Sequence, residues 1–357
     1  MFWANRCRAA VAIAAAFLFS ILPGGSANAA DATSFAGKTV TMIIGSAAGG
    51  GTDVTGRLVA TYLAKYLPGQ PTVIVRNMPG AGGITAMNHV VHQTKPDGLT
   101  VISGATPQVD PQNYRKANAQ YDPAAFHYVG GIGRGGYVLL ISAKAEERLR
   151  QRSSDPVIMG SVPGIPRNAM QMTMWGIEYL GWNAKWVAGY PGTNELTLAL
   201  DRGEIDMTAT GNMFEINERV SSGKFKIVCQ TGNMEGEKIL PRPEFTTSPV
   251  FPAMMDGKIS DPIAQKAFDY WISINSVDKF LAVAPGTPDS VSVAYRYAFD
   301  TMSKDSAFIT KGRSISDDFV PMPGKDIERR VKILAATPAE ATDYIKSLMR
   351  GQGLNVD

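Results

Sequence analysis

The chain has 357 residues, with 35 lysines and arginines against 32 aspartates and glutamates, so its formal net charge is +3 at pH 7. Hydrophobic residues make up 45% of it and charged residues 19%, which excludes an intrinsically disordered protein, because disorder requires low hydrophobicity and high net charge. The nearly balanced charge also argues against a dedicated nucleic-acid binder, which normally carries a basic surplus. A chain of this length usually folds into about two domains.

The N-terminus has the pattern of a secretory signal peptide. Two early arginines precede an uncharged apolar run at 9–22, and Ala27 and Ala29 then supply the small residues that a signal peptidase requires. The run is shorter than the roughly 20 apolar residues of a membrane-spanning helix, although an N-terminal membrane anchor is the alternative interpretation. We therefore predict that residues 1–29 are cleaved off near Ala29 and that the remainder is exported.

The chain has two cysteines, Cys7 and Cys229, which cannot form a framework of disulfides. Cleavage of the leader would remove Cys7 and leave Cys229 in the apolar segment 225–229, which has the pattern of a strand. The loss of two arginines and no acid would also lower the formal charge to +1. We expect Cys229 to be a buried and unreactive thiol.

The segment after the leader alternates strands and helices. β-branched apolar runs at 39–44, 72–75 and 99–102 are typical of buried strands. Helical spacing of apolar residues begins at Val54 and again at Ile84. This order of strand, helix, strand, helix, strand predicts a parallel sheet with helices that cross over its faces.

The rest of the chain repeats the alternation with different residues. The further predicted strands are 157–160, 186–188, 205–208, 226–230 and 280–283, and the further predicted helices are 170–180 and 195–202. Between 288 and 349 the pattern predicts three or four helices with little strand signal. Together these elements predict the α/β fold class with two lobes, of which the second is inserted within the first.

The loop after the first predicted strand, 45–51, is rich in glycine and leads directly into a helix. Such a turn leaves backbone N–H groups free at a helix N-terminus, where anions bind. Three enzyme motifs do not fit this loop. A nucleotide triphosphatase loop needs a lysine before Thr52, and a dinucleotide loop needs glycine in place of Val54 and an acid near Arg76. A nucleophile elbow, Gly-x-Ser-x-Gly, has no match in the loop.

Two more loops of small residues, 77–83 and 103–106, follow the second and third predicted strands. In a parallel sheet the carboxyl ends of the strands lie at one edge, which is where ligands bind in open α/β sheets. Glycine in any single loop could merely permit a tight turn. Three such loops on successive strands instead predict a cleft that receives a polar ligand.

These loops and several later segments together resemble a known family. The motifs that carry the resemblance are Gly49-Gly50-Gly51-Thr52-Asp53 with Arg57, Asn77-x-Pro79-Gly80-Ala81-Gly82-Gly83, Pro96-Asp97-Gly98, Gly189-Tyr190-Pro191-Gly192, Gly203-Glu204-Ile205-Asp206 and Ala284-Pro285-Gly286-Thr287-Pro288. They look like motifs of the Bug or TctC-like receptors of tripartite tricarboxylate transporters. The resemblance runs thinly from about 38 to 345, and its first two motifs are the specific ones.

The resemblance implies a periplasmic solute-binding protein with a two-lobed, type II-like fold, in which each lobe is a mostly parallel sheet flanked by helices and the ligand cleft lies between the lobes. Residues 30–136 with 281–357 would form the first lobe, and 137–280 the inserted second lobe. Such a receptor closes on a small organic acid and delivers it to membrane permease subunits. We expect a monomer that binds no nucleic acid. The alternatives left open are a binding protein that feeds a signalling receptor and an exported hydrolase.

The same resemblance implies where the ligand binds. The loops 48–53 and 81–83 would grip one carboxylate, largely through backbone N–H groups and water. The candidate ligand-binding residues are Ser46, Ala48, Gly49, Gly50, Gly51, Thr52, Asp53, Ala81, Gly82, Gly83, Ser103 and Thr106 in the first lobe and Arg167, Tyr190, Thr193 and Asn194 in the second. Asp53, near the helix start, can cap free N–H groups, so we expect it to position the loop. Arg57, one turn further, would pair with Asp53 rather than with the ligand.

The second lobe departs from the family pattern at 160–167, where members commonly carry a small polar run with Thr and Ser. Arg167 in this segment could clamp a carboxylate through two hydrogen bonds or remain in solvent. The departure puts the usual small dicarboxylates and tricarboxylates in doubt. Trp175, Trp182 and Trp186 could suit an aromatic acid or simply pack in the core, so the sequence leaves both an aliphatic and an aromatic carboxylate open.

Nothing in the sequence assembles a catalytic or metal site. The three histidines are His89, His92 and His127, and only the first two share a predicted helix, with no cluster of Cys or acidic residues at metal-ligand spacing nearby. The nearest carboxylate pair, Glu146-Glu147, lies in a charged run that is typical of a solvated segment, so no general acid and base are brought together. We therefore expect a protein that is not an enzyme, with no catalytic residue, metal or cofactor.

Overall fold

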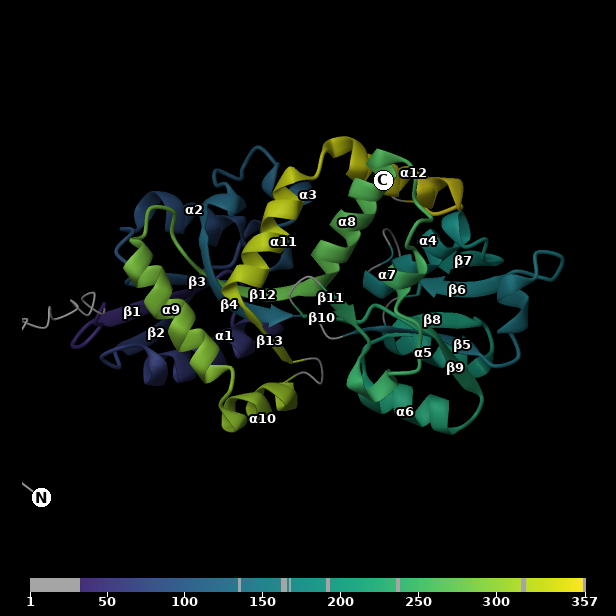
Figure 1. The fold of residues 1–357 in the computed structure, drawn as a ribbon, viewed down its shortest axis with the longest axis horizontal. Helices are drawn as coiled ribbons and strands as arrows, with labels where there is room; N and C mark the ends of the chain where they lie inside the picture. The colour runs from purple at the N-terminus through teal and green to yellow at the C-terminus, as the bar shows by residue number, and fades with distance from the viewer. Residues whose placement is uncertain are drawn as a thin grey trace, which may run out of the picture. The chain divides into compact units, whose positions relative to one another are not determined.

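The computed structural model describes residues 33–133, 136–161, 166, 168–190, 193–235, 238–315 and 319–355. It contains two open sheets, each with helices on its faces (Figure 1). The predicted signal peptide, residues 1–29, lies outside the described residues.

Helices alternate with the strands along most of the chain (Figure 1). They are α1 (Gly51–Tyr66), α2 (Ile84–Gln93), α3 (Pro111–Tyr114), α4 (Gln171–Tyr179), α5 (Thr193–Arg202), α6 (Met213–Ser221), α7 (Phe251–Met254), α8 (Pro262–Ser276), α9 (Asp289–Met302), α10 (Ser306–Ile315), α11 (Gly324–Ala336) and α12 (Ala339–Gly351). Within the described ranges, none of the helices has the length and apolar character that crossing a lipid bilayer requires.

The first sheet has six strands in the order β13-β4-β12-β3-β1-β2. They are β1 (Thr39–Ile44), β2 (Thr72–Asn77), β3 (Thr100–Ala105), β4 (His127–Gly133), β12 (Val277–Val283) and β13 (Val320–Pro323). β1 pairs in parallel with β2 and β3, as the sequence predicts. β12 runs antiparallel to β3 and β4, and β13 runs antiparallel to β4, so β1 to β4 point one way and β12 and β13 the other.

Alternating side chains along β1 explain why helices cover both faces of this sheet. Met42 and Ile44 pack into a core that contains apolar residues of α1, α9 and α10. Ile43 points to the opposite face, into a core that contains residues of α2 and α11. Burial of each such side chain contributes about 1.5–3 kcal/mol, so the apolar run at 39–44 is stable only inside a sheet that is covered on both faces.

The second sheet has five strands in the order β7-β6-β8-β5-β9. They are β5 (Val138–Ser142), β6 (Val157–Ser161), β7 (Ala184–Ala188), β8 (Met207–Thr210) and β9 (Phe225–Gln230). β6 is parallel to β7 and β8, whereas β5 is antiparallel to β8 and β9, so β5 alone among these strands points the other way. Two mixed sheets flanked by helices confirm the predicted α/β fold class.

Besides β4, for which the sequence patterns predicted no strand, two further strand features were missed. The hairpin of β10 (Asn233–Glu235) and β11 (Lys238–Leu240) has short and partly polar strands. β13 contains Pro321 and Pro323, and proline normally argues against a strand because it cannot donate to the ladder. The prolines are tolerated here because β13 lies at the edge of the six-stranded sheet, where one side of each strand has no partner.

The strand predicted at 205–208 begins two residues later, at Met207. Asp206, just before it, is bonded to both neighbouring strands: its N–H donates to the carbonyl of Ile158 at 2.9 Å, and its carbonyl accepts the N–H of Ser142 at 2.8 Å. Its carboxylate adds the backbone N–H of Ile158 at 2.9 Å and a salt bridge with Arg148 at 2.8 Å.

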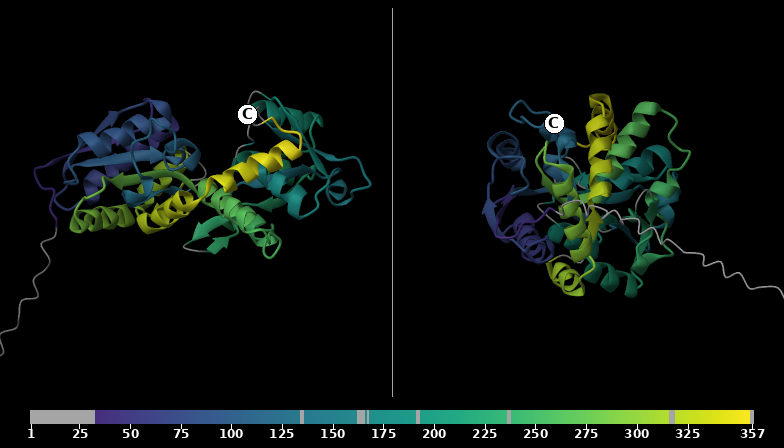
Figure 2. Two further views of the ribbon diagram at one scale, coloured as in Figure 1. Left: turned by 90° about the horizontal axis from the view of Figure 1, so that it is seen from above. Right: turned by 60° about the vertical axis from the view of Figure 1, so that its left-hand side comes forward.

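The C-terminal helix α12 packs against α8 (Figure 1). The C-terminal helices are yellow in Figure 2. The Tyr344 hydroxyl on α12 lies 2.5 Å from the Tyr179 hydroxyl on α4. Gln352, which follows α12, accepts the indole N–H of Trp186 at 3.0 Å. The end of the chain therefore contacts the segment 137–280, and the lobe boundaries drawn from the sequence stay a prediction.

Candidate functional site

Three loops meet at one edge of the six-stranded sheet. They are the β1–α1 loop (45–50), the β2–α2 loop (78–83) and the turn that follows β3, the 3₁₀ helix η2 (Thr106–Gln108). The parallel strands end at the same level, since the N–H of Met78 donates to the carbonyl of Ile44 at 2.8 Å and the N–H of Gly45 to that of Ser103 at 3.2 Å. The edge that the sequence predicts as a ligand site therefore carries all three small-residue loops.

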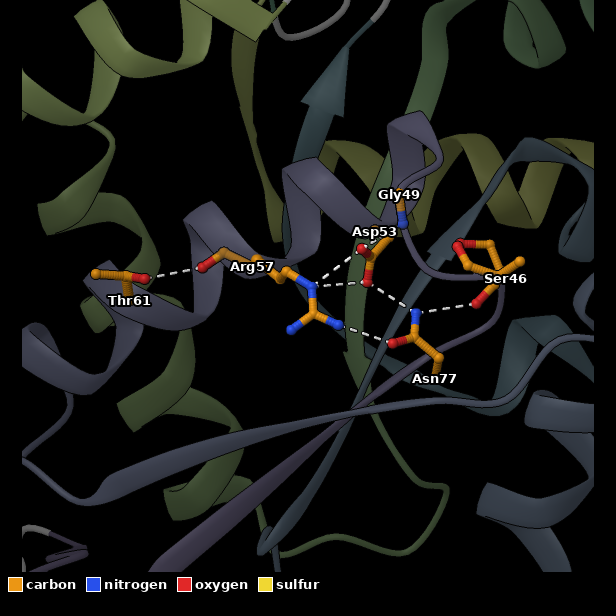
Figure 3. A network of polar contacts seen from close by, with 7 residues as sticks. Ser46, Gly49, Asp53, Arg57, Thr61 and Asn77 are labelled. Atoms are coloured by element: carbon orange, nitrogen blue, oxygen red, sulfur yellow. Dashed lines mark hydrogen bonds and ion pairs between the residues drawn. The ribbon is translucent and has the colours of Figure 1, made fainter.

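Asp53 in the first turn of α1 holds two of these loops together (Figure 3). Its carboxylate accepts the N–H of Gly49 at 2.8 Å, Nε of Arg57 at 3.0 Å and Nδ2 of Asn77 at 2.7 Å. Asn77, at the end of β2, also donates to the carbonyl of Ser46 at 3.0 Å and accepts Nη2 of Arg57 at 2.8 Å. This network fixes the β1–α1 loop to the end of β2.

The charge of Asp53 is satisfied within the protein. The side chain is only 4% exposed, and its hydrogen bond with Arg57, helped by those from Gly49 and Asn77, lowers its pKa to about 2 against the opposing effect of burial. The predicted pair of Asp53 with Arg57 is confirmed. Asp53 differs from the prediction in one detail: it reaches back to Gly49 instead of capping the first turn of α1, whose N-cap is Gly50.

The β2–α2 loop contains four consecutive residues with positive φ. The φ values are 138° at Gly80, 47° at Ala81, 66° at Gly82 and 92° at Gly83. Glycine adopts this region readily, whereas an L-residue such as Ala81 pays about 1–2 kcal/mol for it. No described residue accepts the backbone N–H of Ala81 or Gly82. The loop is therefore a strained turn with free donors at an exposed position.

Gln108 fills the space where the three loops meet. Its side chain is 2% exposed, and its carboxamide oxygen accepts the N–H of Ala105 at 2.5 Å. A Cβ atom at either Gly45 or Gly83 would overlap the Gln108 amide nitrogen. The sequence analysis missed this residue, although an amide two residues after Thr106, in the turn that follows the third strand, was the available signal.

The outer glycines have the opposite surroundings. Gly49, Gly50, Gly51 and Gly82 are exposed, and a Cβ atom at any of them would meet no atom closer than 3.7 Å. Among the described residues, none accepts the backbone N–H of Gly51 or Thr52 at the start of the 16-residue helix α1. Free donors at a helix N-terminus with no side chain in front of them can bind an anion.

Four other predicted first-lobe residues have varied surroundings. Ala48 is exposed beside the outer glycines, and the hydroxyl of half-buried Ser46 donates to the next carbonyl at 3.3 Å. Ser103 is buried within β3. Thr106 donates its hydroxyl to the carbonyl of Val277 on β12 at 2.5 Å. Ser103 and Thr106 thus face other parts of the protein in this structure, and their contact with a ligand stays a prediction.

The second group of predicted residues is described only in part. Arg167 lies outside the described residues, and so do the side chains of Thr193 and Asn194 at the start of α5. Tyr190 is half-buried, and its N–H donates to the carbonyl of Ser161 at the end of β6 at 3.3 Å. The structure therefore brings the first-lobe loops together and leaves the second-lobe contacts as predictions.

A pocket of about 510 Å³ opens next to Thr106. Its lining residues are Thr106, Pro107, Asp110, Gln112, Asn113, Lys116, Pro166, Gln171, Tyr270, Ile274, Asn275, Thr342, Ile345 and Lys346. Burial raises the pKa of Asp110, whose carboxylate accepts the hydroxyl of Tyr270 at 3.2 Å. The pocket is lined by amides, hydroxyls and two ammonium groups, and it lies between η2 and the residues Pro166 and Gln171.

His89 and His92 form contacts within the protein, and Cys229 is buried. His89 contacts Gln93 at 2.9 Å, and His92 contacts the carbonyl of Gln120 at 2.8 Å. Cys229 is fully buried in β9, where burial raises the pKa of its thiol, so the prediction of a buried thiol is confirmed.

The three tryptophans near α4 do not share one environment. Trp175 and Trp182 lie in the core. Trp186 is half-buried and is held by Gln352. Core packing, one of the two uses that the sequence left open, therefore accounts for Trp175 and Trp182.

Comparison with known sequences adds to this geometry. The sequence pattern of the tripartite tricarboxylate transporter family receptors, TctC, matches residues 55–242, more than half of the chain. The chain is 28% identical over 294 residues to a UPF0065 protein of Bordetella pertussis, and the match covers 80% of this chain and 82% of that protein. It is 33% identical over 123 residues to the UPF0065 protein in the gbd 5' region of Cupriavidus necator, 34% of this chain and 36% of that protein.

Solved structures share the fold. A TctC solute binding protein from Polaromonas, solved with no ligand, superimposes with a TM-score of 0.64 at 20% identity, covering 88% of this chain and 98% of that one. The Rpa4515 protein of R. palustris, solved with adipate, gives a TM-score of 0.50 at 19% identity, covering 89% of this chain and 98% of that one. At these identities the similarity establishes the two-lobed binding-protein fold.

Proposed function

Because the chain belongs to the family of tripartite tricarboxylate transporter receptors, whose members are periplasmic solute-binding proteins, we propose that it captures a small organic acid and delivers it to the membrane permease of such a transporter. The function is binding and release without chemical change. This proposal makes the carboxylate of the acid, rather than the rest of the molecule, the group that the first-lobe loops recognise.

The observation that carries the proposal is the uncovered backbone of the outer glycines. Gly49, Gly50 and Gly51 are exposed at the N-terminus of α1, and the N–H groups of Gly51 and Thr52 have no acceptor among the described residues. An ionised carboxylate offers two oxygens that accept such N–H groups, and the positive end of the helix dipole favours its charge. The negative charge of Asp53 does not oppose binding of the carboxylate, because Arg57 neutralises it.

The first-lobe loops supply only part of the binding energy. A helix N-terminus contributes about 0.3–2 kcal/mol toward an anion, whereas a micromolar ligand requires about 8 kcal/mol. We therefore assign the remainder to the segment that contains Arg167, Tyr190, Thr193 and Asn194. Contacts from both lobes would favour a closed form by their differential affinity for it.

In this proposal the protein is first exported to the periplasm. Residues 1–29 would be removed near Ala29, and the mature monomer would act in the periplasm with 30–136 and 281–357 as its first lobe and 137–280 as its second. N-terminal sequencing of the protein recovered from the periplasmic fraction tests the cleavage site. A mature protein that begins at residue 1 would contradict it.

A thermal-shift screen tests the proposed ligand class. The purified mature protein is heated with succinate, malate, adipate or benzoate, and with glucose as an uncharged control. We expect at least one acid, and not glucose, to raise the melting temperature in a concentration-dependent way, because a ligand that binds the folded state alone stabilises it. If none of the four acids does so, the carboxylate assignment is wrong. Loss of uptake of the same acid after deletion of the gene tests delivery to a permease.

A further inference from the structure

Gln108 lies in the turn after β3 and packs against the other two loops of the candidate site. Its side-chain oxygen accepts the N–H of Ala105 at 2.5 Å, and its main-chain carbonyl accepts the hydroxyl of Tyr121 at 2.9 Å. The bond to Ala105 orients the amide. That nitrogen lies against the backbone of Gly45 and Gly83, at the base of the other two loops.

The amide nitrogen of Gln108 has two N–H groups and no acceptor for either among the described residues. The side chain as a whole is 2% exposed. A buried amide donor without a partner is costly, and native proteins usually satisfy such a group with protein, water or ligand. The described polar atoms that are completely enclosed without a partner lie elsewhere, on Thr173, Trp175, Ser292 and Arg330. The Gln108 nitrogen is not among them, so it is not completely enclosed.

We infer that the Gln108 amide is a ligand donor: it directs an N–H group, directly or through one water, at the carboxylate held by the β1–α1 and β2–α2 loops. This inference rests on the proposed function and adds a side chain to the first-lobe part of the site, where the proposed donors are otherwise backbone N–H groups. A neutral amide N–H forms a stronger hydrogen bond with an ionised carboxylate than with the carbonyl of a protonated or amidated end, so it favours the ionised form of the same molecule.

The same side chain also sets the spacing of the loops, because Gly45 and Gly83 pack directly on it. A purely structural Gln108 would therefore also be sensitive to substitution. A structural role and a ligand-binding role of Gln108 predict different results for a substitution that keeps the side-chain volume and changes only the hydrogen-bond donor. Glutamate has nearly the same shape as glutamine, but its ionised form offers an acceptor where a bound carboxylate needs a donor.

Gln108→Glu is compared with Gln93→Glu, the same change on α2 where Gln93 contacts only His89 among the described polar groups. The probe is whichever of succinate, malate, adipate and benzoate raises the melting temperature of the wild-type protein most, and affinity is measured by isothermal titration calorimetry. At neutral pH we expect Q93E to bind like wild type and Q108E to bind about tenfold or more weakly.

Lowering the pH toward about 5 should then narrow the gap between Q108E and wild type, because a protonated glutamate regains an O–H donor. Q108E that is folded and binds within about twofold of wild type at neutral pH overturns the inference. If Q108E does not fold, Gln108→Met removes the donor at similar volume, and unchanged binding by Q108M overturns the inference in the same way.

A crystal structure of the wild-type protein with the same acid tests the contact without any substitution. We expect a carboxylate oxygen, or a water bound to it, within hydrogen-bond distance of Nε2 of Gln108. A ligand seated on the loops with neither contact overturns the inference and leaves the proposed function intact. A wild-type protein that binds none of the four acids overturns the proposed function itself.

Discussion

The glycines of the candidate site fall into an inner and an outer group. Gly45 and Gly83 are buried, and their Cα atoms pack against the Gln108 amide so closely that no Cβ fits. Gly49, Gly50 and Gly82 are exposed and have open space in front of them. The inner positions therefore require glycine because a Cβ atom has no room there. The outer positions, which carry no side chain, leave room for a ligand to reach the backbone.

The two groups together make the loops both open and rigid. The inner glycines and the network of Asp53, Arg57 and Asn77 hold the loops in place, while the backbone of the outer glycines stays uncovered. A site whose donors are already fixed loses less conformational entropy when the ligand binds. Substitutions in the inner group should therefore change the free energy of unfolding more than substitutions in the outer group.

Gly83→Ala is expected to have the largest effect. The residue has φ of 92°, and the new methyl group would overlap the Gln108 amide. Strain in this region costs about 1–2 kcal/mol and overpacking about 1–3 kcal/mol, so the free energy of unfolding should fall by about 3 kcal/mol in urea denaturation.

Gly82→Ala is the matched control for that substitution. It has a similarly positive φ of 66° but no neighbour within 4 Å, so it should lose only the backbone part, about 1–2 kcal/mol. Shortening Gln108 to Ser in the G83A background should recover part of the stability. Equal losses for G82A and G83A would show that Gln108 does not crowd the inner glycines.

Asp53→Asn should lower the free energy of unfolding by about 1.5–3 kcal/mol, because hydrogen bonds to a charged group contribute in that range and the new amide N–H would face Arg57. Asp269→Asn, at a half-buried residue of α8 whose carboxylate accepts an N–H from Gln265, serves as the control and should change stability by less than about 0.5 kcal/mol. A D53N protein as stable as D269N would mean that the network does not support the loop.

Acid should weaken the same network. The pKa of Asp53 is about 2 in the folded protein against 3.8 as the ordinary value, so the unfolded chain binds the proton more readily. The stability that Asp53 contributes is complete above about pH 4 and is lost as the pH falls toward 2. Urea denaturation across this range should show the gap between wild type and D53N closing. A gap that stays constant would contradict the assigned pKa.

The parts of the fold that depend on neighbouring residues were predictable from the sequence. The apolar runs at 39–44 and 72–75 predicted β1 and β2, and the spacing of four between Asp53 and Arg57 predicted their ion pair. Gln108 was not predictable, because its role depends on contacts with Gly45 and Gly83 that exist only once three parallel strands are aligned.

The bond of Asn77 to Asp53 was missed for the same reason, since it joins residues on different strands and helices of the folded sheet. β13 was missed because its two prolines are acceptable only at a sheet edge, and the sequence does not say which strand is the edge. Local pattern thus predicted many of the strands and helices and the loops that meet at one sheet edge, while the side chains that hold these loops together required the tertiary structure.

Gly50→Leu tests whether the outer glycines receive the carboxylate. Gly50 has φ of −77° and ψ of 164°, which any residue adopts, so the substitution should leave the melting temperature of the free protein unchanged. Gly351→Leu, at an exposed glycine with nothing within 4 Å, is the control. We predict that the best acid of the panel raises the melting temperature of wild type and G351L but not that of G50L. An equal shift in G50L would contradict the claim.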